Sequence, residues 1–137
     1  MSTRLRTELS KDNKYYIPKH RRLELKHFVQ QYPDWVKALR EIDGLAKQSI
    51  GNFRYSTERI DPTSKAAELR EYYNDRIKLI TDIANETDRT IGIYILQAII
   101  NGKSYEQMNA TSRLPVCRDV YYELYHKFFF LLDKARR

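Results

Sequence analysis

The chain has 137 residues, of which 31% are charged and 42% hydrophobic, and its formal net charge is +7 at pH 7. This length suits one domain, or one domain with a tail, and only four Gly and four Pro argue against a turn-rich all-β chain. No apolar run approaches the roughly 18 residues that span a membrane, the N-terminus lacks the apolar segment of a secretory signal, and a single Cys excludes an internal disulfide.

The positive charge is concentrated at the two ends of the chain. Residues 1–27 hold eight Lys or Arg against three Asp or Glu, and residues 113–137 hold six against three. Residues 28–112 are close to neutral, with eleven against twelve. This distribution indicates a polyanionic partner, which is a nucleic acid or an acidic membrane surface.

The first part of the chain predicts an arm and two helices. Residues 1–14 have little apolar content and are expected to form a flexible basic arm. Pro18 suits the first turn of one helix, and Pro33 starts a second helix that Gly44 is expected to end or weaken. We expect these helices to form an N-terminal hairpin over residues 15–47.

A linker and a long helix come next. Residues 48–60 show no periodicity and predict a linker. Asp61 and Pro62 then supply a cap acceptor and a favoured first residue for a helix that continues to about Glu86. Its apolar residues recur at three- and four-residue steps: Ala66, Leu69, Tyr73, Ile77, Ile80 and Ala84. Such a helix supports the helices that follow or forms a dimerisation coil.

An apolar helix follows, capped at its start by Thr87 or Asp88 and running from Arg89 to about Asn101, with Gly102 in the position after its end. A helix that is apolar nearly all round belongs in the centre of a core. The predicted fold class is therefore all-α, a helical bundle with its main helical domain over residues 61–137.

Residues 104–134 have the sequence outline of a helix-turn-helix, in which the second helix enters the DNA major groove. Ser104 and Gln107 match a capping box at the start of a short helix. Residues 114–116 form a hydrophobic turn whose Pro disfavours one continuous helix, and Cys117 occupies the N-cap of the last helix. The same outline is also typical of an ordinary corner in a helical bundle.

The last helix carries the candidate DNA-binding residues. Its packing face is expected to contain Val120, Tyr121, Leu124, Phe128 and Leu131. The outward positions, with the cations beside them, are then the expected DNA contacts: Arg113, Arg118, Asp119, Tyr122, Glu123, Tyr125, His126 and Lys127. Arg118 suits a bidentate contact with guanine, and the hydroxyls of Tyr122 and Tyr125 suit phosphate oxygens. Asp119 and Glu123 repel phosphates, although either can accept from cytosine N4.

Several motifs follow one another in an order that a known family shares. They are Tyr32-Pro33, Asp61-Pro62, the Gly-Lys-Ser-Tyr run at 102–105, and Arg118-Asp119 before Tyr121-Tyr122. In this layout the chain resembles the RinA/ArpU group of phage late-gene transcriptional regulators over residues 20–137, with specific motif similarity at 100–131. The resemblance implies a C-terminal helix-turn-helix similar to region 4 of sigma factors. It also implies DNA binding, regulation of phage or prophage genes, and a place in the cytoplasm of a bacterial host.

An enzyme is not expected. His20, His27 and His126 have no carboxylate or Cys at metal-ligand spacing, and neither a glycine-rich phosphate loop nor a nucleophile arrangement occurs. We expect no catalytic residue, metal, cofactor, small-molecule substrate or membrane partner. The expected partner is double-stranded DNA, with RNA polymerase and a second copy of the chain as further candidates.

Two alternatives stay open at this point. The first is a phage DNA-packaging component similar to a small terminase subunit, which would assemble through the long helix. The second is a helical protein-interaction module that does not bind DNA.

Overall fold

A computed structural model of the chain describes residues 9–51 and 62–137. All regular secondary structure in these residues is helical, and no strand occurs among them. The expected all-α helical bundle is therefore confirmed. No helix within the described ranges is both long and apolar enough to cross a membrane.

The chain divides into two compact units. Unit 1 comprises Met1–Gln31 and Leu79–Arg137, and unit 2 comprises Tyr32–Lys78. Helix α4 (Pro62–Thr87) contributes residues to both units. The predicted hairpin over residues 15–47 is therefore divided between the two units. Its first helix belongs to unit 1 with the C-terminal helices, and its second helix belongs to unit 2.

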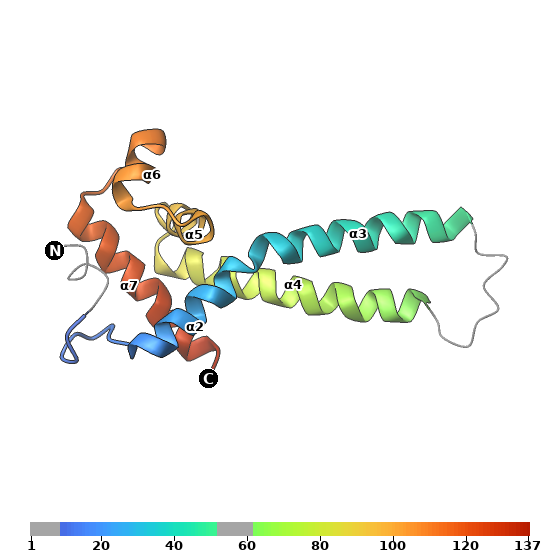
Figure 1. Ribbon diagram of the computed structural model, residues 1–137, viewed down its shortest axis with the longest axis horizontal. Coiled ribbons are helices and arrows are strands. Elements are labelled where there is room, and N and C mark those ends of the chain that lie inside the picture. Colours follow the sequence, from blue (N-terminus) through green and yellow to red (C-terminus); the bar gives the residue numbers. More distant parts are fainter. Residues whose placement is uncertain (1–8, 52–61) are drawn as a thin grey trace. The chain divides into compact units, whose positions relative to one another are not determined.

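Unit 2 is a helical hairpin of α3 (Tyr32–Gly51) and the first part of α4, which run side by side (Figure 1). An ion pair joins the two helices, with Nη2 of Arg70 lying 3.1 Å from Oδ1 of Asp43. Because both side chains are well exposed, this pair contributes only about 0–1 kcal/mol to stability. The pair thus shows which turns of α3 and α4 lie next to each other, and it adds little to the stability of the hairpin.

Helix α3 differs from its prediction at the C-terminal end. Pro33 lies in its first turn as expected, but Gly44 lies inside the helix and does not end it. One Gly costs a helix interior only about 1 kcal/mol, which is small enough for the rest of a 20-residue helix to offset. The predicted linker at 48–60 was therefore wrong for residues 48–51, which are helical, and its remainder lies outside the described residues.

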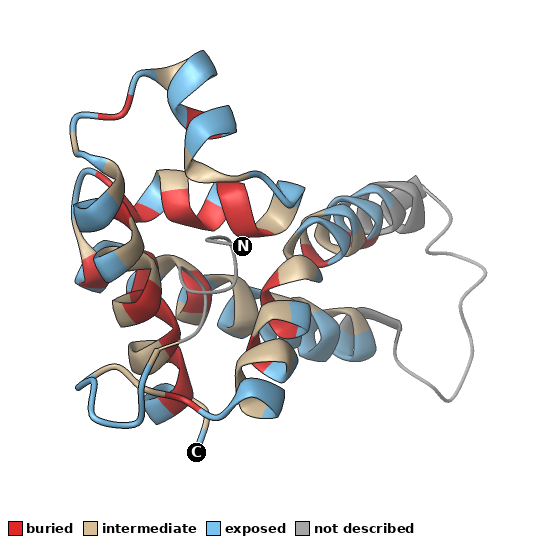
Figure 2. Ribbon diagram, turned by 60° about the vertical axis from the view of Figure 1, so that its left-hand side comes forward, coloured by how far each residue is buried: buried red, intermediate tan, exposed pale blue. Residues whose placement is uncertain are grey.

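Unit 1 contains α2 (Lys19–Gln30), α5 (Gly92–Asn101), α6 (Tyr105–Ser112) and α7 (Arg118–Ala135), together with the end of α4. Helix α5 contacts α2, α6 and α7, and α7 also contacts α2 and α6. Buried positions gather on α5 and on the middle of α7 (Figure 2). The largest fully buried side chains are Leu25, Val29, Ile80, Ile91, Ile95, Leu96, Tyr121, Phe128, Phe129 and Leu132. The apolar α5 is thus part of the core, as its composition predicted.

Asp88 forms the link between α4 and α5. Its Oδ1 accepts hydrogen bonds from the backbone N–H groups of Thr90 and Ile91, both at 2.8 Å. The hydroxyl of Thr87 instead donates to the carbonyl of Ile83 at 2.8 Å. Of the two predicted caps, Asp88 is therefore the one that supplies an acceptor to the next segment.

The start of α5 is determined by a close backbone approach at Gly92. A Cβ placed there would lie 1.9 Å from the carbonyl oxygen of Ala84, so only Gly fits. The turn at 89–91 delays the helix relative to its predicted start at Arg89. Gly102 follows the helix in the left-handed conformation, with a φ of 65°, as its position predicted.

The N-terminal segment forms turns next to α7. The N–H of Asn13 donates to the carbonyl of Ser10 at 3.0 Å, and the ring of Tyr15 packs against that of Phe130 with centroids 5.5 Å apart. Residues 9–14 of the predicted flexible arm therefore have a definite conformation in this structure, while residues 1–8 lie outside the described part.

Candidate nucleic-acid interface

The capping box at the start of α6 is present in full. Oγ of Ser104 accepts from the backbone N–H of Gln107 at 3.2 Å, and Oε1 of Gln107 accepts from the N–H of Ser104 at 2.9 Å. After α6, Arg113 adopts a left-handed conformation with a φ of 48°. Helix α7 begins after Cys117, whose side chain makes no capping hydrogen bond. The two predicted helices and both predicted N-caps are confirmed.

The turn between the helices is tied to α6 by two side chains. Oδ1 of Asn109 accepts from the N–H of Leu114 at 2.8 Å, and the hydroxyl of Tyr105 donates to the carbonyl of Val116 at 2.7 Å. Leu114 is buried, which adds an apolar anchor. These contacts fix where the first turn of α7 lies relative to α6.

Helix α7 is rotated about its axis relative to the predicted packing face. Val120 was expected to pack inward, but its side chain is 40% exposed, while Leu124 and Leu131 are half-buried. The buried positions are Tyr121, His126, Phe128, Phe129, Leu132 and Asp133. Tyr121 and Phe128 of the predicted face are therefore buried, but Phe129 and Leu132 are buried with them on the side of α7 that contacts its neighbouring helices.

Three predicted contacts on this helix are therefore turned toward the protein. His126 is only 6% exposed, so its predicted outward placement was wrong. Tyr125 is half-buried against the ring of Phe129, and burial raises the pKa of its phenol. The hydroxyl of Tyr122 accepts a 3.2 Å hydrogen bond from the N–H of Tyr105. The two tyrosines accordingly position α7 against its neighbours.

The remaining candidates face outward at the start of α7. Asp119 and Glu123 are exposed, Arg113 is exposed in the turn, and Lys127 is half-buried. Their side chains can reach a partner without unfolding any part of unit 1. The outward face is thus smaller than the sequence suggested and consists of charged residues of both signs.

Arg118 has unused hydrogen-bonding capacity. Its Nε lies 3.2 Å from Oε2 of Glu106, which forms an ion pair across α6 and α7. That contact is not aligned as a hydrogen bond: within the described residues, neither Nε nor Nη2 of Arg118 has a hydrogen-bond partner. Buried donors without partners are rare and often indicate a binding site. The Arg118 side chain is partly exposed, but these two donors are enclosed, so a ligand contacts them only once the side chain has moved.

A groove of about 630 Å³ runs beside this face. Its walls come from the N-terminal segment and from the first turns of α7: Leu9, Asn13, Lys14, Tyr15, Arg118, Asp119, Val120, Tyr122, Glu123 and His126. The N-terminal segment therefore lies beside the candidate recognition face and adds the charge of Lys14 to it.

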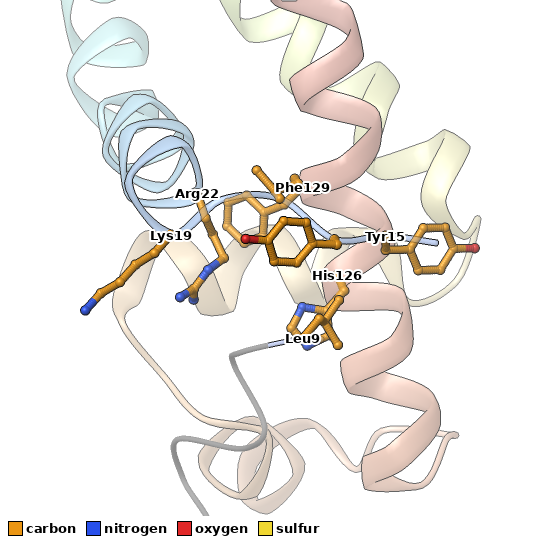
Figure 3. Close-up of a pocket in the computed structure, with 8 residues that line it drawn as sticks. Leu9, Tyr15, Lys19, Arg22, His126 and Phe129 are labelled. Atoms are coloured by element: carbon orange, nitrogen blue, oxygen red, sulfur yellow. The ribbon is translucent and has the colours of Figure 1, made fainter. Parts of the chain in front are cut away.

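A second hollow, of about 200 Å³, lies between the N-terminal segment, α2 and α7 (Figure 3). Lys19 and Arg22 of α2 line this hollow, and so do His126 and Phe129 of α7. A third hollow, of about 290 Å³, is lined by Lys26 of α2, by Lys103 and by aromatic residues of α7. Sequence reasoning did not single out these α2 cations, although their spacing of three and four residues was a visible signal.

Within the described part of the chain, no group of three or more His, Cys, Asp or Glu is placed to bind a metal ion. Comparison of the chain with models of protein families, with curated proteins and with solved structures found no match.

Proposed function

We propose that this chain is a sequence-specific double-stranded DNA-binding transcriptional regulator in which α6, its turn and α7 act as a helix-turn-helix. The observation that carries the proposal is the guanidinium of Arg118, which lies at the N-terminal turn of α7 with donors that no described residue satisfies. Arg is the side chain that most often contacts guanine specifically, through O6 and N7. The position is the one from which a recognition helix contacts bases.

The neighbouring residues support this role with different chemistry. Arg113 in the turn and Lys127 further along α7 supply cations that can contact phosphates. Such phosphate contacts orient a protein on the duplex. Asp119 and Glu123 can accept hydrogen bonds from cytosine N4, and they repel backbone that approaches in another register. Tyr122 holds the start of α6 through its hydroxyl, so its contribution is to the angle of α7.

The regulatory part of the proposal rests on the resemblance to the RinA/ArpU group, whose members act on phage late genes. The motifs of that resemblance at 102–105 and 118–122 form the capping box region and the first turn of α7. They are thus the residues on which the proposed DNA contact depends.

Selection of duplexes from a random pool, followed by fluorescence anisotropy, tests the proposal. We expect an enriched sequence that binds at least about 10³-fold more tightly than random duplex at physiological salt. Binding that is equal for all sequences would contradict specific recognition, and absence of binding at low salt would contradict DNA binding altogether.

An assembling packaging component is the second candidate, because α4 exposes two large apolar side chains. Leu69 and Tyr72 are 40% and 48% exposed and lie three residues apart, on one face of the hairpin. Exposed apolar groups of this kind favour self-association. Mass measurement in solution separates the candidates: a ring of many subunits supports packaging, and a monomer or dimer supports the regulator.

A further inference from the structure

Helix α2 carries a stripe of cations that the proposed recognition helix does not use. Lys19, Arg22 and Lys26 are spaced three and four residues apart, which places them on one face of the helix. From the first to the last, the stripe spans about 10 Å along the helix axis. We refer to these three residues as the α2 stripe.

The charge of the stripe is not neutralised within the described residues, because none of their ion pairs includes a stripe residue. Glu24 is the one acidic residue of α2, and it pairs with Arg21. Glu106, which lines the hollow beside Lys26, pairs with Arg118. These two carboxylates are thus paired with cations outside the stripe.

Open space lies along the whole stripe. Lys19 and Arg22 line the 200 Å³ hollow, and Lys26 lines the 290 Å³ hollow together with Lys103. Tyr125 of α7 also lines the 290 Å³ hollow; burial raises the pKa of its phenol, and the charge of Arg22 opposes that rise. Each cation of the stripe therefore borders a hollow, and Lys103, which lines the same hollow as Lys26, adds a fourth cation.

The stripe is next to the outward face of α7. Leu9, Tyr15 and His126 line both the 200 Å³ hollow and the 630 Å³ groove beside Arg118. The groove and the hollow that Lys19 and Arg22 line therefore adjoin at these three residues.

We propose that the α2 stripe, extended by Lys103, binds the phosphate backbone of duplex DNA adjacent to the base pairs that α7 contacts. This inference rests on the proposed DNA-binding function and adds a second, sequence-independent contact to it. One DNA strand carries a phosphate for each 3.4 Å of helix axis, so a stripe of about 10 Å faces about three phosphates. Two Lys act as point charges and the planar Arg22 fork can bind one phosphate with two hydrogen bonds.

The test uses the full chain with all three stripe residues changed to Gln (Lys19→Gln, Arg22→Gln, Lys26→Gln). The matched control changes three exposed cations of unit 2 by the same charge (Lys37→Gln, Arg40→Gln, Lys65→Gln). Affinity for a random-sequence duplex of about 30 base pairs is measured by anisotropy over a range of KCl concentrations. Circular dichroism establishes that both variants are folded.

We expect the slope of log affinity against log salt to become shallower by about 2–3 in the stripe variant, since each lost phosphate contact removes about 0.9. The control should change that slope by less than about 0.5. Equal changes in both variants would overturn the inference, because they would reflect net charge alone. An unchanged stripe variant beside a tightly binding wild type would also overturn it while leaving the proposed function intact. Failure of the wild type to bind any duplex would overturn both.

Discussion

Nε of Arg21 in α2 donates a 2.7 Å hydrogen bond to Oδ1 of Asp133 near the end of α7, and so connects the beginning of unit 1 to its end. Nη2 of Arg137 donates to the other oxygen of the same carboxylate at 2.9 Å. Burial by itself would raise the pKa of Asp133, but these two hydrogen bonds outweigh it and hold the pKa below its usual value. The carboxylate is therefore ionised in the fold and stabilises it.

Replacement of Arg21 by Met should lower the free energy of unfolding by about 1–3 kcal/mol at pH 7, since a buried carboxylate loses one of its charged donors. Because the pKa of Asp133 is depressed in the fold, the stabilisation is complete above the unfolded pKa of about 3.9 and is lost as pH falls through the folded value. Urea unfolding at pH 7 and between pH 4 and pH 2.5 should thus show the difference between wild type and variant shrinking with acid. Glu24→Gln serves as the control, because it removes only the exposed partner of Arg21 and should cost less than about 1 kcal/mol. A control as destabilised as Arg21→Met would show that the pair with Asp133 is unimportant.

Glu106 should restrain Arg118 in the free protein. Glu106→Gln is expected to tighten binding to the selected duplex by roughly 2–5-fold, since Arg118 no longer has to leave an exposed ion pair. Arg118→Ala should weaken the same binding by about 1–3 kcal/mol and reduce discrimination against random duplex. The double variant separates the causes by anisotropy: if Glu106→Gln still tightens binding without Arg118, the gain comes from net charge and the restraint of Arg118 by Glu106 is contradicted.

Gly92 and Gly44 should respond in opposite directions to Ala. At Gly92 the new methyl would meet the backbone carbonyl of Ala84 at 1.9 Å, so α4 and α5 must separate, and we expect a loss of more than about 2 kcal/mol. At Gly44, inside α3, no atom lies within 4 Å, so Ala should stabilise the helix by about 0.4–1 kcal/mol. Thermal unfolding followed by circular dichroism measures both, and a tolerated Gly92→Ala would show that the close approach is not maintained in solution.

The two N-caps of the interface offer a further pair of variants. Ser104→Ala removes the acceptor of the capping box and should destabilise the protein by about 1 kcal/mol. Cys117→Ser adds an acceptor where the present side chain makes no capping hydrogen bond, and should stabilise α7 by about 0.5–1 kcal/mol. Chemical denaturation of both variants checks the signs. Destabilisation by Cys117→Ser would mean that the thiol makes a favourable contact that a hydroxyl cannot replace.

The sequence predicted local features of the interface well and the orientation of its helices poorly. Ser104 and Gly102 have the predicted roles because each makes its hydrogen bonds, or takes its backbone conformation, within a few residues of itself. Asp88 accepts hydrogen bonds in the turn before α5 but does not cap that helix, which begins at Gly92. His126 and Val120 exchanged their expected environments, because large apolar side chains occur on several sides of α7 and periodicity alone does not choose the buried one. Gly44 was also misjudged, because its cost to a helix is smaller than the stability of the helix around it.

By itself, the sequence determined that the protein is all-α, where most of its later helices begin and end, and that its charge lies near the two termini. Only the tertiary structure decided that α2 packs with α5 and α7, that Arg118 pairs with Glu106, and that the α2 stripe lies beside the groove of α7. The physical reason is one of range. Caps and turns are determined by hydrogen bonds between near neighbours, whereas the buried face of a helix depends on residues that are distant along the chain.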